Sequence, residues 1–299
     1  RMMSTCGHTS RAASIVNDAP EVYDLWKPKN YDTTAFRGPV RLREALAQSI
    51  NTVAIRVMSE IGPGRVADLA QAMGIQNHNL PRELSLALGS GEVTPLHLVN
   101  AYATFAAGGR YQPPVFLTQI GDKKLASAGV PTQALRPEVA YILTSMMRSV
   151  VDEGTAARAR ILRAPLSGKT GTSNDARDGW FIGYTDNIVV GVWVGFDDRR
   201  PLGRRESGGH AALPIWIDFM KVALKKRGAG KLSPPPGVVT ARIDRASGLL
   251  AAPGETDAQT LDEVFLDGTV PTETATAPGE VNPSDFLLNS AEGDPAEGL

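Results

Sequence analysis

The chain of 299 residues predicts an α+β fold, in which helices pack against an antiparallel sheet. In the first half of the chain, apolar residues recur at three- and four-residue spacings, as in amphipathic helices. In the second half, short β-branched and aromatic runs bounded by turn residues replace that period. Helices followed by hairpin strands and a further helix indicate an antiparallel sheet with packed helices.

Amphipathic helices account for most of the first half. The first is predicted from Val40 to Ser59, and Gly62-Pro63-Gly64 ends it. Thr94 and Pro95 form the N-cap and first turn of another, which closes at Gly108-Gly109. The remaining predicted helices of this half are Arg65–Met73 and Glu138–Val151, the second opened by Pro137.

Strands are predicted next. The run Ile188–Phe196 is typical of a buried central strand, and Asp186-Asn187 predicts a tight turn back to a strand at Trp180–Thr185. Leu166–Thr172 is expected beside them. The later elements are a helix at Ala211–Lys226 and a hairpin at Val238–Leu250 that turns at Ser247-Gly248.

Charge and cysteine content exclude several classes of function. The net charge is −1, so no general electrostatic argument supports binding to nucleic acid or to an anionic membrane. A single cysteine, Cys6, excludes an internal disulfide and a CxxC metal site, and no histidines stand at metal spacing. We expect no metal and no cofactor. No apolar run approaches the length of a transmembrane helix.

The segment Ser167-Gly168-Lys169-Thr170-Gly171-Thr172 carries the first chemical signal. Read as a phosphate loop, it lacks the glycine five residues before Gly168, where Arg163 stands, and no helix pattern follows it. Lys-Thr-Gly on an edge strand instead occurs in serine acyl-transfer enzymes, beside Ser-x-x-Lys and Ser-x-Asn elements. Ser49-Ile50-Asn51 supplies a Ser-x-Asn triplet, although such a triplet is common by chance.

Several longer segments resemble class A penicillin-binding proteins, the bifunctional enzymes that polymerise and cross-link peptidoglycan. They follow the family's order and extend over about Ala13 to Thr272. The segments are Arg41–Asn51, Ala87–Leu96, Ala101–Ala106, Gly168–Asp175, Arg177–Tyr184 and Gly191–Gly195. The resemblance implies the penicilloyl-serine transferase fold that β-lactamases and transpeptidases share. It also implies a DD-transpeptidase that works outside the bacterial cytoplasmic membrane.

The same resemblance implies a role for each motif residue. Ser49 relays a proton toward the leaving group, and Asn51 bonds the substrate amide. Lys169 sets the local positive potential, and the strand through Thr170, Gly171 and Thr172 binds the substrate carboxylate. The Thr172 backbone N–H is one of two oxyanion donors. The implied partners are peptidoglycan stem peptides ending in D-Ala-D-Ala, and β-lactams that mimic them.

The chain departs from the family in its nucleophile. No serine in the 299 residues is followed three positions later by lysine, and Ser145-Met146-Met147-Arg148 places a guanidinium, which is not a base at pH 7, in the lysine position. Alignment of Ala13–Pro20 with the penicillin-binding protein family puts the nucleophile at or just before residue 1. Two explanations compete: a piece of a longer anchored enzyme, which the intact motifs favour, or a catalytically dead relative that binds stem peptides or β-lactams.

Composition divides the chain into four regions. The last basic residue is Arg245, and 11 acidic residues follow it. The end is poor in aliphatic periodicity and is expected to be a disordered acidic tail. The predicted regions are an atypical N-terminus at 1–12, a transpeptidase domain at 13–232, a hairpin extension at 233–271 and the acidic tail at 272–299.

Overall fold

The computed structural model describes residues 11–31, 35–75, 80–125, 129–203 and 206–276. Most of the predicted N-terminal region and of the predicted acidic tail therefore lies outside the described residues. The α-helices are α1 (Leu42–Gln48), α2 (Asn51–Ile61), α3 (Pro63–Ala72), α4 (Pro95–Ala106), α5 (Pro137–Asp152) and α6 (Leu213–Arg227). Shorter helical turns are η1 (Leu84–Leu88), η2 (Ala157–Leu162), η3 (Asn174–Ala176) and the π-turn η4 (Gly208–Ala212).

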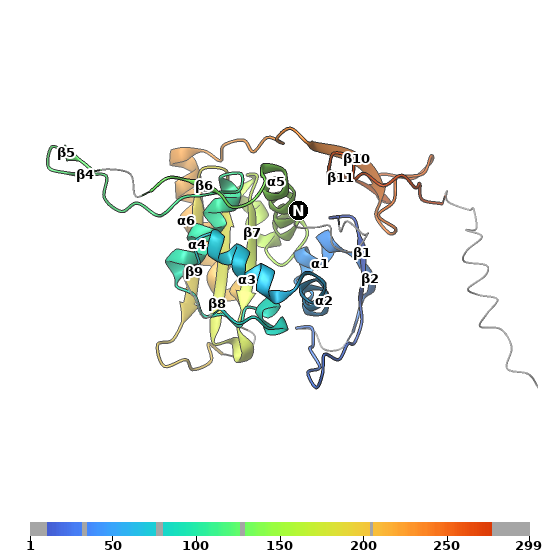
Figure 1. Ribbon diagram of the computed structural model, residues 1–299, viewed down its shortest axis with the longest axis horizontal. Coiled ribbons are helices and arrows are strands. Elements are labelled where there is room, and N and C mark those ends of the chain that lie inside the picture. The colour runs from blue at the N-terminus through green and yellow to red at the C-terminus, as the bar shows by residue number, and fades with distance from the viewer. Residues whose placement is uncertain (1–10, 32–34, 76–79, 126–128, 204–205, 277–299) are drawn as a thin grey trace, which may run out of the picture.

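The principal sheet is antiparallel and has the order β7-β8-β9 (Figure 1). The two-stranded pairs are β1-β2, β3-β6, β4-β5 and β10-β11. The strands are β1 (Ile15–Asp18), β2 (Gly38–Arg41), β3 (Arg110–Tyr111), β4 (Gln119–Ile120), β5 (Lys123–Lys124), β6 (Thr132–Gln133), β7 (Ser167–Thr172), β8 (Asp178–Tyr184), β9 (Val189–Gly195), β10 (Val238–Asp244) and β11 (Thr260–Leu266).

The register of the principal sheet confirms the predicted hairpin and its third strand. Lys169 of β7 lies opposite Ile182 of β8, and the Thr185 N–H closes the β8–β9 turn on the Ile188 carbonyl at 2.9 Å. The central position predicted for the Ile188–Phe196 run is wrong, because β8 is the middle strand and β9 is an edge of the described sheet. Helices cover both faces of β9, and that cover accounts for its continuous apolar sequence.

Helices lie on both faces of this sheet. On one face, Trp216 of α6 packs edge-on against Phe181, with ring centroids 5.0 Å apart, and its indole N–H donates to the Val190 carbonyl at 3.0 Å. On the other face, the Tyr184 hydroxyl lies 3.0 Å from the Thr144 hydroxyl of α5. All of the ring systems in these contacts are buried. The result is three layers, helix, sheet and helix, with β7 free along its outer edge among the described strands.

The helix predicted from Val40 to Ser59 is wrong as a single element. Its first residues belong to β2, and α1 and α2 are separate helices that meet at Ser49. Ser49 has φ 58° and ψ 48°, in the left-handed region, and Ile50 is extended. No glycine or proline stands at the break to signal it in the sequence. The contacts that hold the break come from residues distant in sequence.

The predicted C-terminal hairpin is wrong in its partner strand. β10 pairs over its whole length with β11, and the turn at Ser247-Gly248 adds only an isolated bridge between Ile243 and Leu250. Ile243 and Phe265 form a small core with Ala13. Burial of these side chains favours the wider hairpin, because its alternating residues share one apolar face.

Candidate active site

Ser49 occupies the junction between two helices. It follows the last residue of α1, and its backbone N–H donates to the Leu46 carbonyl at 3.2 Å. A left-handed conformation costs a non-glycine residue about 1 kcal/mol, and such residues persist only where surrounding contacts hold them. The conformation turns the chain sharply, so that Ser49 and Asn51 stand at the facing ends of α1 and α2.

The loop between β1 and β2 holds the beginning of α2. The Asn51 carboxamide donates to the Lys29 carbonyl at 2.9 Å, and the Thr52 N–H donates to the Asn30 carboxamide oxygen at 3.2 Å. The Thr52 hydroxyl donates to Asp18, which is 1% exposed. These contacts replace a local N-cap for α2, which has none from its own N-cap residue.

Asp18 is the buried centre of that loop. Burial opposes its ionisation, but hydrogen bonds from the Thr52 hydroxyl, the Arg37 backbone N–H and the Asn30 carboxamide outweigh it, so the pKa of Asp18 lies below its usual value. The carboxylate therefore accepts hydrogen bonds from three segments at once and ties them together at neutral pH.

Lys169 joins the two sequence motifs. Its ammonium donates to the Ser49 hydroxyl at 2.7 Å and to the Thr170 carbonyl at 3.0 Å. Burial lowers the pKa of Lys169 from 10.5 to about 8. The segment is a strand followed by the three-residue turn η3, so the phosphate-loop alternative, which requires a loop and a following helix, is wrong.

Two residues outside the sheet, Thr155 and Gly208, bond to the threonine hydroxyls of β7. The Thr170 hydroxyl lies 2.7 Å from that of Thr155, and the Thr172 hydroxyl accepts from the Gly208 N–H at 3.0 Å. Gly171 lies between them, opposite Trp180 of β8. An added Cβ at Gly208 would stand 2.2 Å from the Trp180 carbonyl oxygen, so only glycine allows this approach.

The structure thus brings Ser49 and Lys169 into direct contact and places Thr170, Gly171 and Thr172 along the same strand. Asn51 is nearby in sequence, but its carboxamide donor is engaged by the Lys29 carbonyl rather than by the Ser49–Lys169 pair. Thr155 and Gly208 were not anticipated. The Gly-Thr pair just after α5 and the Gly-Gly pair at the start of η4 were the available signals.

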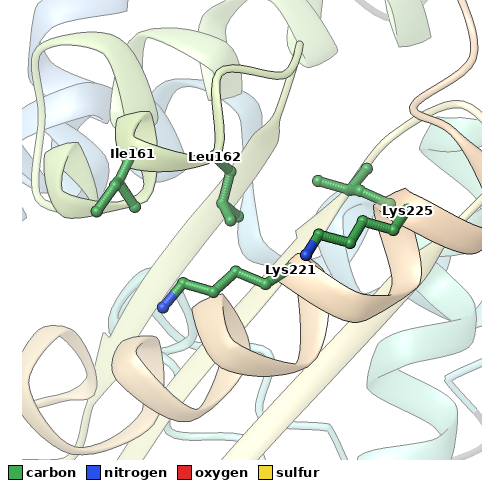
Figure 2. Close-up of a pocket in the computed structure, with 5 residues that line it drawn as sticks. Ile161, Leu162, Lys221 and Lys225 are labelled. Atoms are coloured by element: carbon green, nitrogen blue, oxygen red, sulfur yellow. The ribbon is translucent and has the colours of Figure 1, made fainter.

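A separate pocket of about 360 Å³ lies between η2 and α6 (Figure 2). The residues that line it are Ile161, Leu162, Lys221, Leu224 and Lys225. None of the motif residues contributes to it.

Within the described ranges, no group of three or more histidine, cysteine, aspartate or glutamate side chains is arranged to hold a metal ion. No helix in the same ranges has the length and apolarity to cross a bilayer.

Family comparison agrees with this geometry. Residues 11–221 match the family described as penicillin binding protein transpeptidase domain. The chain belongs to this family. Residues 234–279, which hold β10 and β11, match a second family, the penicillin-binding protein 1A C-terminal domain. The transpeptidase match includes both motifs, Ser49-Ile50-Asn51 and Lys169-Thr170-Gly171-Thr172. Because penicillin-binding transpeptidases share the penicilloyl-serine transferase fold, the fold that the sequence predicts is confirmed.

Individual relatives place the transpeptidase domain among penicillin-binding proteins 1A. The protein of that name from Pseudomonas aeruginosa is 39% identical over 304 residues, covering 81% of this chain and 37% of its own length. That from Aquifex aeolicus is 39% identical over 256 residues, covering 84% and 34%. The chain therefore spans about a third of the length of these curated relatives.

Solved structures give the same result. The crystal structure of penicillin-binding protein 1A from Haemophilus influenzae superposes with a TM-score of 0.80 at 31% identity, covering 89% of this chain and 46% of that one. The structure of the PonA1 protein from Mycobacterium tuberculosis in complex with penicillin V superposes with a TM-score of 0.63 at 26% identity, covering 74% and 65%. The transpeptidase fold is thus shared with a chain that binds penicillin.

Proposed function

We propose that this chain supplies the proton-relay and substrate-binding side of a peptidoglycan DD-transpeptidase site, acting outside the cytoplasmic membrane. One observation carries the proposal: Lys169 and Ser49, 120 positions apart, meet at 2.7 Å in a family whose members bind penicillin. The ligands are stem peptides ending in D-Ala-D-Ala, with β-lactams as their mimics.

The strand β7 has the donors that a terminal carboxylate requires. The Thr172 hydroxyl accepts from the Gly208 N–H, so its own proton is left to donate. In the Thr155–Thr170 pair one hydroxyl donates to the other, and the second proton points onward. Gly171, between the two threonines, has no side chain to hold a peptide backbone away from the strand. Together these groups present two hydroxyl donors beside a cationic lysine.

The Lys169–Ser49 pair can move a proton. When the leaving amine departs, the Ser49 hydroxyl gives it a proton and receives one from the Lys169 ammonium, which becomes neutral. A pKa of about 8 leaves about a tenth of Lys169 unprotonated at pH 7, so this transfer is energetically accessible. Asn51 is the proposed partner of the substrate amide, reached when its carboxamide exchanges the Lys29 carbonyl for the ligand.

The acyl-enzyme requires a nucleophile that these 299 residues do not contain as a Ser-x-x-Lys motif. We therefore expect this chain alone to form no covalent β-lactam adduct. Intact mass spectrometry after incubation with a penicillin checks this on a chain shown to be folded by circular dichroism. A stoichiometric adduct would mean that another serine acts as nucleophile, and the proposal of inactivity would be wrong.

The second candidate function is a binding module without catalysis, favoured by the same missing motif. It predicts reversible binding of a D-Ala-D-Ala peptide by this chain, measured by calorimetry and abolished by Lys169→Ala. The enzymatic proposal makes a different prediction: a chain extended by a helix with a Ser-x-x-Lys motif forms a covalent acyl adduct with a penicillin.

In the extended chain, Lys169→Ala and Asn51→Ala should each slow acylation by a fluorescent penicillin at least about a hundredfold, the effect of one preorganised donor. Lys123→Ala, on the exposed strand β5, is the matched control and should acylate at the parent rate. Near-parental rates in the two site variants would contradict the assigned roles.

A further inference from the structure

The C-terminal hairpin β10–β11 touches the segment that ends at Ser49. The hairpin belongs to the region matched as the C-terminal domain, outside residues 11–221, and its strand β11 packs against α5. In the connection between β10 and β11, the Arg245 carbonyl accepts from the Arg41 guanidinium at 2.8 Å, and a Cβ added at Gly248 would lie 2.2 Å from the Ala13 carbonyl oxygen. A contact between two separately recognised regions thus lies at the base of α1.

The centre of this contact is a buried ion pair between Arg43 and Glu263. The Arg43 Nε donates to one carboxylate oxygen of Glu263 at 2.7 Å and Nη2 donates to the other, so the pair is bidentate. Arg43 is 7% exposed and Glu263 is 0% exposed. Both groups are out of water, and each depends on the other for its charge partner.

The Arg43 guanidinium also donates three hydrogen bonds to α5. Its Nη1 donates to the Ser145 carbonyl at 2.7 Å and to the Ser149 hydroxyl at 3.1 Å, and its Nη2 donates to the Ser145 hydroxyl at 3.1 Å. With the two bonds to Glu263, all five guanidinium N–H groups have acceptors. Arg43 is therefore fixed in one position between α5 and the C-terminal hairpin.

The fixed position of Arg43 matters because α1 is short. The helix has seven residues, fewer than an isolated helix needs for stability in water, and Arg43 is its second residue. Its far end is Ser49, in the strained left-handed conformation. At that end the Ala47 carbonyl accepts from the Thr155 N–H at 3.1 Å. Both ends of α1 are tied to other segments: the Leu42 N–H donates to the Ser14 carbonyl at 2.9 Å, and the Gln48 carboxamide donates to the Glu153 carbonyl at 3.0 Å. Among these contacts Arg43 supplies the buried ion pair.

We propose that Glu263 is a positioning residue for the active site: through Arg43 it fixes α1 and thereby holds the Ser49 hydroxyl against Lys169. This inference rests on the proposed roles of Ser49 and Lys169. It gives the C-terminal domain a part in the transpeptidase site, although the elements packed against the motif strand β7 are β8, α5 and η4. A purely structural ion pair would hold the hairpin in place and leave the Ser49–Lys169 contact unchanged.

The test reads the ionisation of Lys169 in the full 299-residue chain. The chain is labelled with ¹³C-lysine, the Lys169 side-chain resonance is assigned with Lys169→Arg, and its pKa is measured by NMR titration. Glu263→Gln should release α1, expose Lys169 to water and raise its pKa from about 8 by at least about 0.5, a threefold change in its protonation equilibrium. Removal of a negative charge without movement acts in the opposite direction, because it disfavours the ammonium.

The matched control is Asp262→Asn, which removes a charge from the adjacent residue of β11. Asp262 pairs with Arg242 on the exposed face, and its side chain is 66% exposed. This control should leave the pKa of Lys169 unchanged. An unchanged or lowered pKa of Lys169 in folded Glu263→Gln overturns the inference while leaving the proposed catalytic roles intact.

If Glu263→Gln does not fold, Glu263→Asp decides. It keeps the charge but withdraws the carboxylate by one methylene, so it should raise the pKa of Lys169 in the same direction by a smaller amount. No rise in this variant overturns the inference. A Lys169 pKa near 10.5 in the parent chain would instead contradict the burial of Lys169 on which the proposed proton relay depends, so the two failures are distinguishable.

Discussion

Gly208 provides the sharpest test of how the turn η4 is seated on the substrate-binding strand. A Cβ at this position would lie 2.2 Å from the Trp180 carbonyl oxygen and 2.4 Å from the Gly171 carbonyl oxygen. Both neighbours are backbone atoms of paired strands, which cannot rotate away. Gly208→Ala must therefore move η4 by roughly 1 Å to reach ordinary contact distances. That movement also breaks the hydrogen bond from the Gly208 N–H to Thr172.

The expected cost follows from these two effects. Overpacking in a well-packed site costs about 1–3 kcal/mol, and loss of the hydrogen bond costs about 1 kcal/mol more. The free energy of unfolding should fall by about 2–4 kcal/mol. With a urea dependence of about 3 kcal/mol per molar, the midpoint of urea denaturation should fall by roughly 0.7–1.3 M, measured by tryptophan fluorescence and far-ultraviolet circular dichroism.

Gly209→Ala is the matched control one residue later. Its added Cβ would have its nearest neighbour, the Thr155 carbonyl oxygen, at 3.5 Å, which is ordinary contact. This variant should stay within about 0.5 kcal/mol of the parent. Equal midpoints for the two alanine variants, with equal slopes, would refute the argument that backbone contact forces glycine at position 208.

Three further predictions concern charge, packing and capping. Because the folded-state pKa of Lys169 is lowered to about 8 from 10.5, the unfolded chain binds more protons between these pH values, and the free energy of unfolding should rise across this window. The increase is at most about 3 kcal/mol, and the partial exposure of Lys169 reduces it. Urea denaturation of the parent and of Lys169→Met between pH 7.5 and 10.5 measures it, and the increase should be absent in the variant. An equal increase in Lys169→Met would assign the pH dependence to another group. Trp216→Ala should lower the free energy of unfolding by about 3–5 kcal/mol in urea denaturation, since the side chain is 0% exposed and leaves a cavity against the sheet, whereas an effect below 1 kcal/mol would show that the α6 interface is loosely packed. The Thr94 hydroxyl accepts from the His97 N–H at 3.3 Å in the first turn of α4, so Thr94→Ala should lower the free energy of unfolding by about 1 kcal/mol and speed amide hydrogen exchange in that turn. Thr94→Ser should keep the parent exchange rate. Equal exchange rates in all three proteins would contradict a capping role for Thr94.

Local patterns were sufficient for elements whose limits are set by nearby residues. The Thr94-Pro95 start of α4 is confirmed because capping and the fixed φ of proline act within one turn. The turn at Asp186-Asn187 is confirmed because the flanking residues Thr185 and Ile188 bond to each other across it. The break at Ser49 was missed because the groups that hold the start of α2, Asp18 among them, come from another segment.

The candidate site divides in the same way. The residue types and their order along the chain identify the Ser49 and Lys169 motifs and the family, since they carry the chemistry in their side chains. Their separation of 2.7 Å, the lowered pKa of Lys169 and the bond from Gly208 to Thr172 could not be read from the sequence. These properties depend on burial and on distances between segments far apart in the chain, which arise only when helices, sheet and C-terminal hairpin pack together.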